Sequence, residues 1–424
     1  MLHHSHKCYG PMGASMDEVA GAPGRALNPL NCVFAARALR DFGDSFVAIL
    51  LPAYLLALGF TPLAVGVLAT VSLSGSACLT IGAGLLGARY GYRRLLLIAA
   101  GLMVVSGLAF AASRDYAALL VIAFAGTINP SAGNVSVFVP LEHAALAHET
   151  GNANRTRMFA RYSLAGALAA AVGALVAGAP EVTAPPGLDR LNAMRGMFVL
   201  YALLGLAGRA LYARLPQRSN PANTVPSAAL GPSRFIVIRL AALFSLDAFA
   251  GGFVVQSLLA LWLFQRFHLS LAAAGVFFFC ASLLAALSFP VAARLSRRFG
   301  LVNTMVFTHI PSSIALILAA LAPTLGLALT LLLVRAALSQ MDVPTRSSYV
   351  MAVVTQPERA AAASFTSVPR SLASAASPAM AGALFAVSAV AWPLLICGAL
   401  KIAYDLLLLV QFRRLKPPEE RRAR

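Results

Sequence analysis

Hydrophobic residues along the chain form long runs that are separated by short polar or glycine- and proline-containing breaks. Each run has about 18 residues or more, close to the length that an α-helix needs to cross the hydrocarbon core of a bilayer. The pattern predicts an all-α membrane protein with twelve transmembrane helices. The expected spans are 32–58, 62–86, 95–112, 117–141, 158–178, 192–213, 236–264, 271–292, 304–322, 325–350, 364–388 and 392–411.

Composition supports a lipid-facing surface. Hydrophobic residues make up 59% of the chain and charged residues only 11%. A soluble domain carries about 25% charged residues. So few charges cannot cover a surface that faces water, so most of the surface is expected to contact membrane lipids.

The net charge of +18 does not indicate nucleic-acid binding, because the basic residues lie in small clusters between apolar runs. Arginine clusters in alternate connections are the pattern of the positive-inside rule. With both termini cytoplasmic, the even-numbered connections hold most of the arginines. The sequence therefore predicts a multi-pass protein of the cell inner membrane.

The expected divisions of the chain are a disordered cytoplasmic tail, a first bundle of six helices, a solvated linker, a second bundle of six helices and a basic tail. The polar beginning lacks the apolar region of a signal peptide. Which of three methionines starts the chain stays open: Met1, Met12 or Met16. The divisions are 1–31, 32–214, 215–235, 236–411 and 412–424.

The two halves of the chain repeat each other at one fixed offset. Gly66 and Gly275 are 209 residues apart (275 − 66), and three further identical pairs have the same spacing. Two parallel repeats of six helices, related by pseudo-symmetry, account for this regularity. The three further pairs are Gly91 with Gly300, Arg161 with Arg370, and Gly173 with Gly382.

The connection after the second span resembles the signature loop of the major facilitator superfamily, glycine-x-leucine-x-aspartate-arginine-x-glycine followed by basic residues. The run from Gly84 to Arg94 reads GLLGARYGYRR, and its repeat ends at Arg298 and Gly300. The residues that carry the resemblance are Gly84, Arg89, Gly91, Arg93, Arg94, Arg298 and Gly300. The resemblance implies a secondary transporter that works by alternating access.

The loop departs from the pattern because Ala88 and Arg297 occupy the positions of the family's aspartate, which the resemblance implies would lock the cytoplasmic gate. Acid–base pairs at matched helix ends of the two halves are expected to replace part of the role of this missing aspartate. There, Glu142 is predicted to pair with Arg161, and Glu358 with Arg370.

Ionisable residues inside a span are costly and each is a functional hypothesis. In the first span, Arg37 and Asp41, and Arg40 and Asp44, are four residues apart and can pair on one helix. Either they neutralise each other structurally or one aspartate carries a coupled proton. The proton-coupling candidates are Asp44, Asp41 and Asp247.

Proline and polar residues in the fourth and tenth spans predict kinked helices that line a cavity, although helix packing is the alternative. Asp342 and Arg346 are expected to pair, as are Lys401 and Asp405, while His309 is expected to bond locally. The candidates for the substrate cavity are Asn129, Asn134, Ser131, Gln256, Asp342, Arg346 and Arg335.

The chain shows no P-loop, no nucleophile–base set and no paired cysteines. We therefore expect neither an enzyme nor a metal or cofactor site, and we expect a monomer. The predicted function is proton-coupled export of a small organic or drug-like solute, because the spans carry few polar groups for sugars. A metabolite or sugar symporter and a membrane receptor or scaffold without transport are the alternatives.

Overall fold

The computed structural model describes residues 28–132, 136–149, 155–182, 189–217, 231–355, 358–388 and 391–412. Most of the predicted first tail, the middle of the linker and nearly all of the last tail lie outside these residues. The described part of the chain folds into α-helices and contains no strand. The helices are α1 (Pro29–Ala57), α2 (Pro62–Tyr90), α3 (Tyr92–Ala112), α4 (Tyr116–Ala125), α5 (Phe138–Glu149), α6 (Arg155–Val176), α7 (Ala179–Val182), α8 (Arg190–Ala213), α9 (Arg234–Gly252), α10 (Gln256–Phe267), α11 (Leu271–Phe299), α12 (Leu301–Leu321), α13 (Leu325–Ser339), α14 (Asp342–Val353), α15 (Arg359–Val387) and α16 (Trp392–Phe412).

These helices are consistent with the predicted twelve spans. Nine spans are single long helices, and three are built from two shorter helices each: α4 with α5, α9 with α10, and α13 with α14. Within the described residues, eight stretches are long and apolar enough to cross a membrane. The α1 and α15 helices are not among these eight although each has 29 residues. The four charges of α1 make that helix less apolar, and the serines, the two prolines and Arg370 do the same for α15.

Repeat-related residues begin and end the second span of each half. The Thr61 hydroxyl accepts a hydrogen bond from Ala64 N at the start of α2, and Ser270 caps α11 in the same way. Gly91 ends α2 at φ 73° and Gly300 ends α11 at φ 85°, a left-handed conformation that favours glycine. The predicted tight turns are therefore present in both halves.

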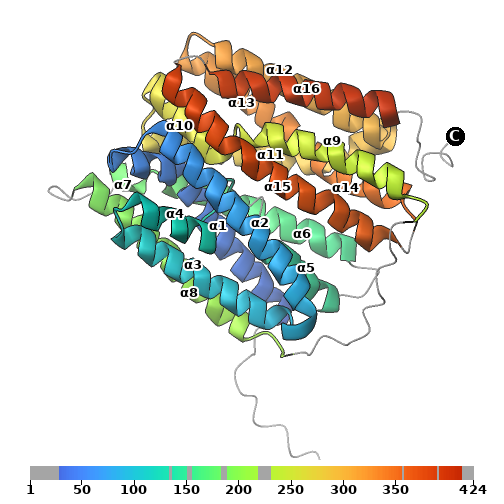
Figure 1. The fold of residues 1–424 in the computed structure, drawn as a ribbon, viewed down its shortest axis with the longest axis horizontal. Coiled ribbons are helices and arrows are strands. Elements are labelled where there is room, and N and C mark those ends of the chain that lie inside the picture. Colours follow the sequence, from blue (N-terminus) through green and yellow to red (C-terminus); the bar gives the residue numbers. More distant parts are fainter. Residues whose placement is uncertain are drawn as a thin grey trace, which may run out of the picture.

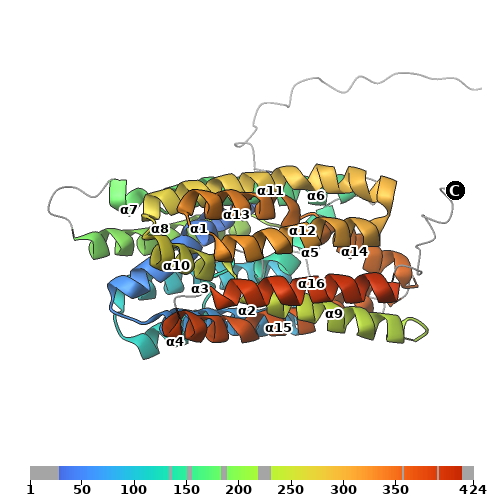
Figure 2. The ribbon, with the colours of Figure 1, turned by 90° about the horizontal axis from the view of Figure 1, so that it is seen from above.

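The two halves lie beside each other, with the blue-to-green helices on one side and the yellow-to-red helices on the other (Figure 1). We call the end of the bundle that holds the beginning of α1 and the end of α16 the basic end, because α2 and α11 also place Arg89 and Arg298 there. The opposite end is the distal end. Figure 2 shows the same elongated bundle from above.

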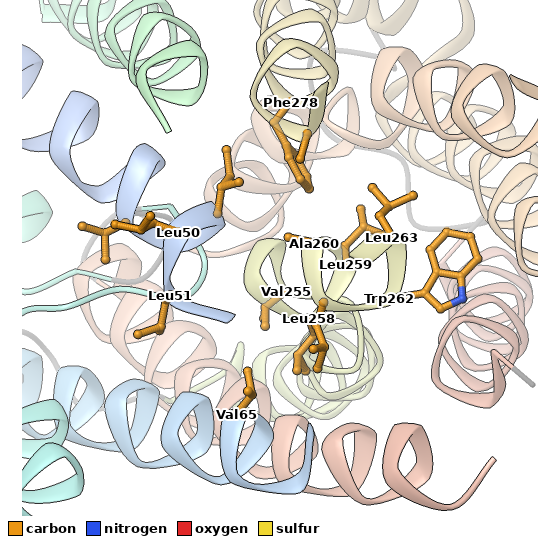
Figure 3. Packing of buried hydrophobic residues seen from close by; sticks show 14 of the residues in the cluster. Leu50, Leu51, Val65, Val255, Leu258, Leu259, Ala260, Trp262, Leu263 and Phe278 are labelled. Carbon is orange, nitrogen blue, oxygen red and sulfur yellow. The ribbon is translucent and has the colours of Figure 1, made fainter. Parts of the chain in front are cut away.

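Hydrophobic packing differs between these two ends. One core contains residues of both halves, and Figure 3 shows Val65 of α2 close to Leu258 of α10. Two further cores lie toward the basic end, and each belongs to one half only. The N-terminal one includes Leu96 and the C-terminal one Val306.

Glycines allow the halves to touch closely toward the distal end. A Cβ on Gly66 of α2 would lie 2.4 Å from the Pro378 carbonyl oxygen and 2.8 Å from the Gly382 Cα, both on α15. A Cβ on Gly275 of α11 would lie 2.7 Å from the Ala174 carbonyl oxygen on α6. Gly66 and Gly275, which are related by the fixed offset in the sequence, thus both lie at contacts between the halves. Gly84 of the signature loop, by contrast, has open space around the position of a Cβ.

Hydrogen bonds between the halves, among the described residues, lie from the middle of the bundle to the distal end. Near that end, Ala272 N donates to Glu181 Oε2 at 2.9 Å, and Ala379 N donates to Thr70 Oγ1 at 2.9 Å. Together with the separate cores, these contacts show a bundle whose halves are joined at the distal end and packed separately toward the basic end.

Candidate functional site

Charged residues of α1 meet helices of the N-terminal half in a buried network. Asp41 forms ion pairs with two arginines, since its Oδ2 lies 2.6 Å from Arg37 Nε and its Oδ1 lies 3.1 Å from Arg40 Nη1. The other Nη of Arg40 contacts Glu142 Oε2 of α5 at 2.9 Å. The expected pair of Arg37 and Asp41 is present, and the ionised form of Asp41 is held by two guanidiniums.

Asp44 has a different environment from Asp41. It is buried, and its Oδ2 lies 3.8 Å from Arg40 Nη1, which exceeds hydrogen-bonding distance. Its Oδ1 is 3.0 Å from the Tyr201 hydroxyl of α8, and that hydroxyl also lies 3.1 Å from the Thr127 carbonyl oxygen. The expected pair of Arg40 and Asp44 is therefore weak, because Glu142 and Asp41 draw the guanidinium away.

Glu142 forms no pair with Arg161, contrary to the sequence prediction. Its fully buried carboxylate accepts from the Tyr162 hydroxyl of α6, from the Tyr212 hydroxyl of α8 at 2.5 Å and from Arg40. Arg161 is exposed instead. The physical reason is that the buried Glu142 carboxylate is hydrogen-bonded by donors from neighbouring helices, whereas the Arg161 side chain is exposed at the surface of the bundle.

Glu358 likewise forms no pair with Arg370 in the described part of the chain. Its carboxylate accepts from Gly231 N at 2.5 Å, Ser233 Oγ at 2.6 Å and Thr355 Oγ1 at 2.5 Å. These hydrogen bonds to the charged form lower the pKa of Glu358 to about 2. The carboxylate thus joins the beginnings of α9 and α15 within the C-terminal half.

A second buried network occupies the C-terminal half around Asp247 of α9. Lys401 Nζ of α16 lies 2.6 Å from Asp247 Oδ1, and Arg346 Nη1 of α14 lies 2.9 Å from Asp247 Oδ2. Arg346 Nη2 also lies 3.1 Å from Asp342 Oδ2, so the predicted pair of Asp342 and Arg346 is present. Asp247 thus contacts two cations of other helices.

The expected pair of Lys401 and Asp405 is wrong. Lys401 contacts Asp247, while Asp405 lies 3.0 Å from His309 Nδ1 of α12. Their spacing of four residues allowed a pair on one helix, but buried partners on neighbouring helices offered closer contacts. His309 was expected to bond locally, but it contacts Asp405 of α16 instead. Tyr404, which was not singled out in the sequence, lies against the His309 ring because α12 packs against α16. Arg335 of α13 is half-buried near Cys397 and forms no ion pair with a described carboxylate.

The breaks in the fourth and seventh spans meet at the centre of the bundle. Ser257 N, at the start of α10, donates to the Pro130 carbonyl oxygen at 3.1 Å. Beside this contact, Gln256 Nε2 lies 3.5 Å from the Ser45 carbonyl oxygen of α1. The predicted kink of the fourth span is confirmed, and Ala132 there has φ 51°.

The predicted cavity residues of the fourth span lie beside this contact. Asn129 is buried, and its Oδ1 accepts from Ser131 N at 2.9 Å and Ser131 Oγ at 2.7 Å. Asn134 lies outside the described residues. The break in the seventh span was not expected, and the paired Gly251 and Gly252 before it were its only sequence signal.

Arginines of the signature loop form the same contact in both halves. The guanidinium of Arg89 lies over the ring of Tyr90 at 5.5 Å, and that of Arg298 over Phe299 at 5.4 Å. Arg93 Nη2 donates to the Ala213 carbonyl oxygen at 2.7 Å, and Arg94 is exposed. These residues hold the loops at the basic end, where such aromatic and cationic side chains suit a membrane interface.

Comparison with known proteins agrees with this architecture. The chain matches the Major Facilitator Superfamily over residues 33–334 and again over 240–424. It belongs to this superfamily. This superfamily member is 24% identical over 423 residues to the uncharacterized membrane protein YJR124C of Saccharomyces cerevisiae, covering 91% of this chain and 94% of that protein.

Solved structures of other transporters share the fold of this superfamily member. The xylose transporter XylE from E. coli, in its inward open conformation, has a TM-score of 0.71 at 15% identity, over 93% of this chain and 98% of that chain. The nucleoside transporter NupG has a TM-score of 0.69 at 13% identity, over 91% of this chain and 100% of that chain. The chain is thus a multi-pass membrane protein with the fold of this transporter superfamily.

Proposed function

We propose that this superfamily member exports a small organic or drug-like solute across the cell inner membrane in exchange for protons. The basic end is the cytoplasmic end in this proposal, in accord with the positive-inside rule. The described conformation is then inward-facing, with halves joined on the periplasmic side. Alternating access follows from moving the two halves relative to each other.

The observation that carries proton coupling is the hydrogen-bond arrangement at Asp44. The Tyr201 hydroxyl has one hydrogen but lies within bonding distance of both Asp44 Oδ1 and the Thr127 carbonyl oxygen. When the phenol donates to the carbonyl, only a protonated Asp44 supplies the hydrogen for the other contact. When Asp44 is ionised, the phenol donates to it. Both protonation states therefore have a hydrogen-bonded arrangement.

Asp44 is also the acid of α1 that lies next to the contact between the halves. The following residue, Ser45, accepts the Gln256 amide from the C-terminal half through its carbonyl oxygen. A change in the charge of Asp44 would act on α1 one residue away from this contact. Asp41, which two arginines hold, is the reserve candidate.

The test begins with a growth screen of a deletion strain against toxic compounds, which identifies a solute for flux measurements in proteoliposomes. We expect Asp44→Asn to bind the solute but to lose accumulation driven by a proton gradient. Asp115→Asn is the control, because Asp115 is an exposed cap of α4. It should keep the wild-type rate.

Three outcomes would overturn parts of this proposal. Proton-driven accumulation in both Asp44→Asn and Asp41→Asn would exclude α1 as the coupling element. Uptake that follows an inward proton gradient would favour a symporter over an exporter. Solute binding without flux in the wild-type protein would favour a receptor.

A further inference from the structure

In the buried network of the C-terminal half, each of the three carboxylates already has a basic partner. Asp247 is shared by Arg346 and Lys401, Asp342 is bound by Arg346, and Asp405 is bound by His309. Arg370 of α15 belongs to the same region, since Arg346 is its strongest electrostatic neighbour and Asp247 and Asp342 are further ones. No described carboxylate forms an ion pair with Arg370.

The position of Arg370 on α15 directs it toward this network. Four residues later, the Ser374 carbonyl oxygen lies against Gly252 of α9, and seven residues later, Ser377 Oγ donates to the Phe249 carbonyl oxygen at 2.6 Å. Residues at these spacings share one face of a helix. Arg370 thus lies on the face of α15 that packs against α9, where the Asp247 network is, and not on the face that meets α2.

Arg370 is nevertheless exposed, and its position along α15 explains why. It lies twelve residues, or roughly 18 Å, from Gly382, at which α15 touches α2 toward the distal end. In the basic part of the bundle the halves have separate cores. Arg370 is six residues inside the expected span 364–388 (370 − 364), where an arginine is costly unless it faces an aqueous cavity. Its guanidinium is therefore accessible from the space between the halves.

Its repeat partner Arg161 has different surroundings. Arg161 is also exposed, but it lies on the side of α6 that carries the exposed apolar residues Leu164 and Leu168. The acids around Asp44 belong to the opposite half and have their own arginines. An exposed guanidinium beside a buried guanidinium thus occurs at Arg370 and not at its equivalent in the N-terminal half.

We propose that Arg370 binds an anionic group, a carboxylate or phosphate, on the transported solute. The inference rests on the proposed transport function and narrows its substrate to a small organic anion. Arg346 contributes the electrostatic field of its positive charge but no direct contact with the anion, because its Nη1 already binds Asp247 and its Nη2 already binds Asp342. The free planar donors of Arg370 suit two-point recognition of an anion. Binding also relieves the repulsion between the two guanidiniums.

The test uses four aromatic probes that differ in charge: benzoate, phenyl phosphate, benzyl alcohol and benzylamine. Thermal unfolding of the purified full chain is followed in detergent with each probe at about 10 mM, a concentration that saturates a site of millimolar Kd. We expect the two anions to raise the unfolding temperature and the neutral and cationic probes not to. Arg370→Gln should abolish the increase, and Arg370→Lys should keep part of it.

Arg266→Gln is the matched control, because it removes one exposed arginine at the distal end of α10. It should respond to the anions as the wild type does. An equal response to all four probes, no response to either anion, or an unchanged response in Arg370→Gln would overturn the proposal.

Flux measurements separate this inference from the transport function. Anion binding that depends on Arg370, in a protein that moves no solute in proteoliposomes, would keep the anion site and reject transport. Transport of a neutral or cationic solute at the same rate in wild type and Arg370→Gln would keep transport and reject the anion site.

Discussion

Arg346 lies between two carboxylates that come from different places in the chain. Asp342 is one turn away on α14, whereas Asp247 is on α9 and is also bound by Lys401. Loss of either aspartate leaves Arg346 with the other one, but loss of Asp247 also removes the carboxylate that binds Lys401 in the described part of the chain. The two aspartates contribute unequally although both touch the same guanidinium.

We expect Asp247→Ala to destabilise the fold on the order of 3–5 kcal/mol, the usual cost of leaving a buried charge unpaired. Asp342→Ala should cost less, because Asp247 still neutralises Arg346. The unfolding temperature in detergent measures both effects. Adding Lys401→Ala to Asp247→Ala should restore part of the loss, and strict additivity of the two changes would show that they do not interact.

At the scale of helices, glycine decides where the two halves touch. Gly66 and Gly82 lie on the same helix, α2, but only Gly66 has backbone atoms of α15 within the space of a methyl group. Backbone cannot move aside as a flexible side chain can. A methyl group at position 66 would separate α2 from α15, whereas position 82 has room for it.

The prediction is that Gly66→Ala opens the distal end and Gly82→Ala does not. Distances between spin labels at Ala57 and His268, exposed distal positions of the two halves, measure the opening in a cysteine-free background. Gly66→Ala should shift the distribution to longer distances than in the wild type. An unchanged distribution would mean that this glycine contact does not keep the end closed.

At the scale of the molecule, the two halves share hydrophobic packing at one end only. A core shared by both halves seals the distal part, and separate cores stabilise each half near the basic end. Each half can then keep its own packing while the shared contacts break. This arrangement suits a rocking motion of two six-helix bundles.

The orientation of the whole molecule is testable with reporter fusions. Fusions within 220–230 and at the C-terminus should report the cytoplasm, and fusions within 183–187 should report the periplasm, as the distribution of arginine predicts. A periplasmic signal at 220–230 would contradict the twelve-span topology with both termini inside.

The sequence alone determined the spans, the repeat and the helix ends, because these depend on local properties. Long apolar runs define the helices, and Thr61, Ser270, Gly91 and Gly300 mark ends that are visible without knowledge of neighbours. The pair of Asp342 and Arg346 was predictable for the same reason, since four residues is one helical turn.

Only the tertiary structure decided the partners of the other buried charges. Glu142 binds Arg40 and two tyrosines from other helices, and Lys401 binds Asp247 instead of the acid on its own helix. A buried charge takes whichever counter-charge the packing brings nearest, because burial makes an unpaired ion costly. The partner of a buried charge therefore depends on which helix faces meet, and the spacing of residues along the sequence does not reveal this.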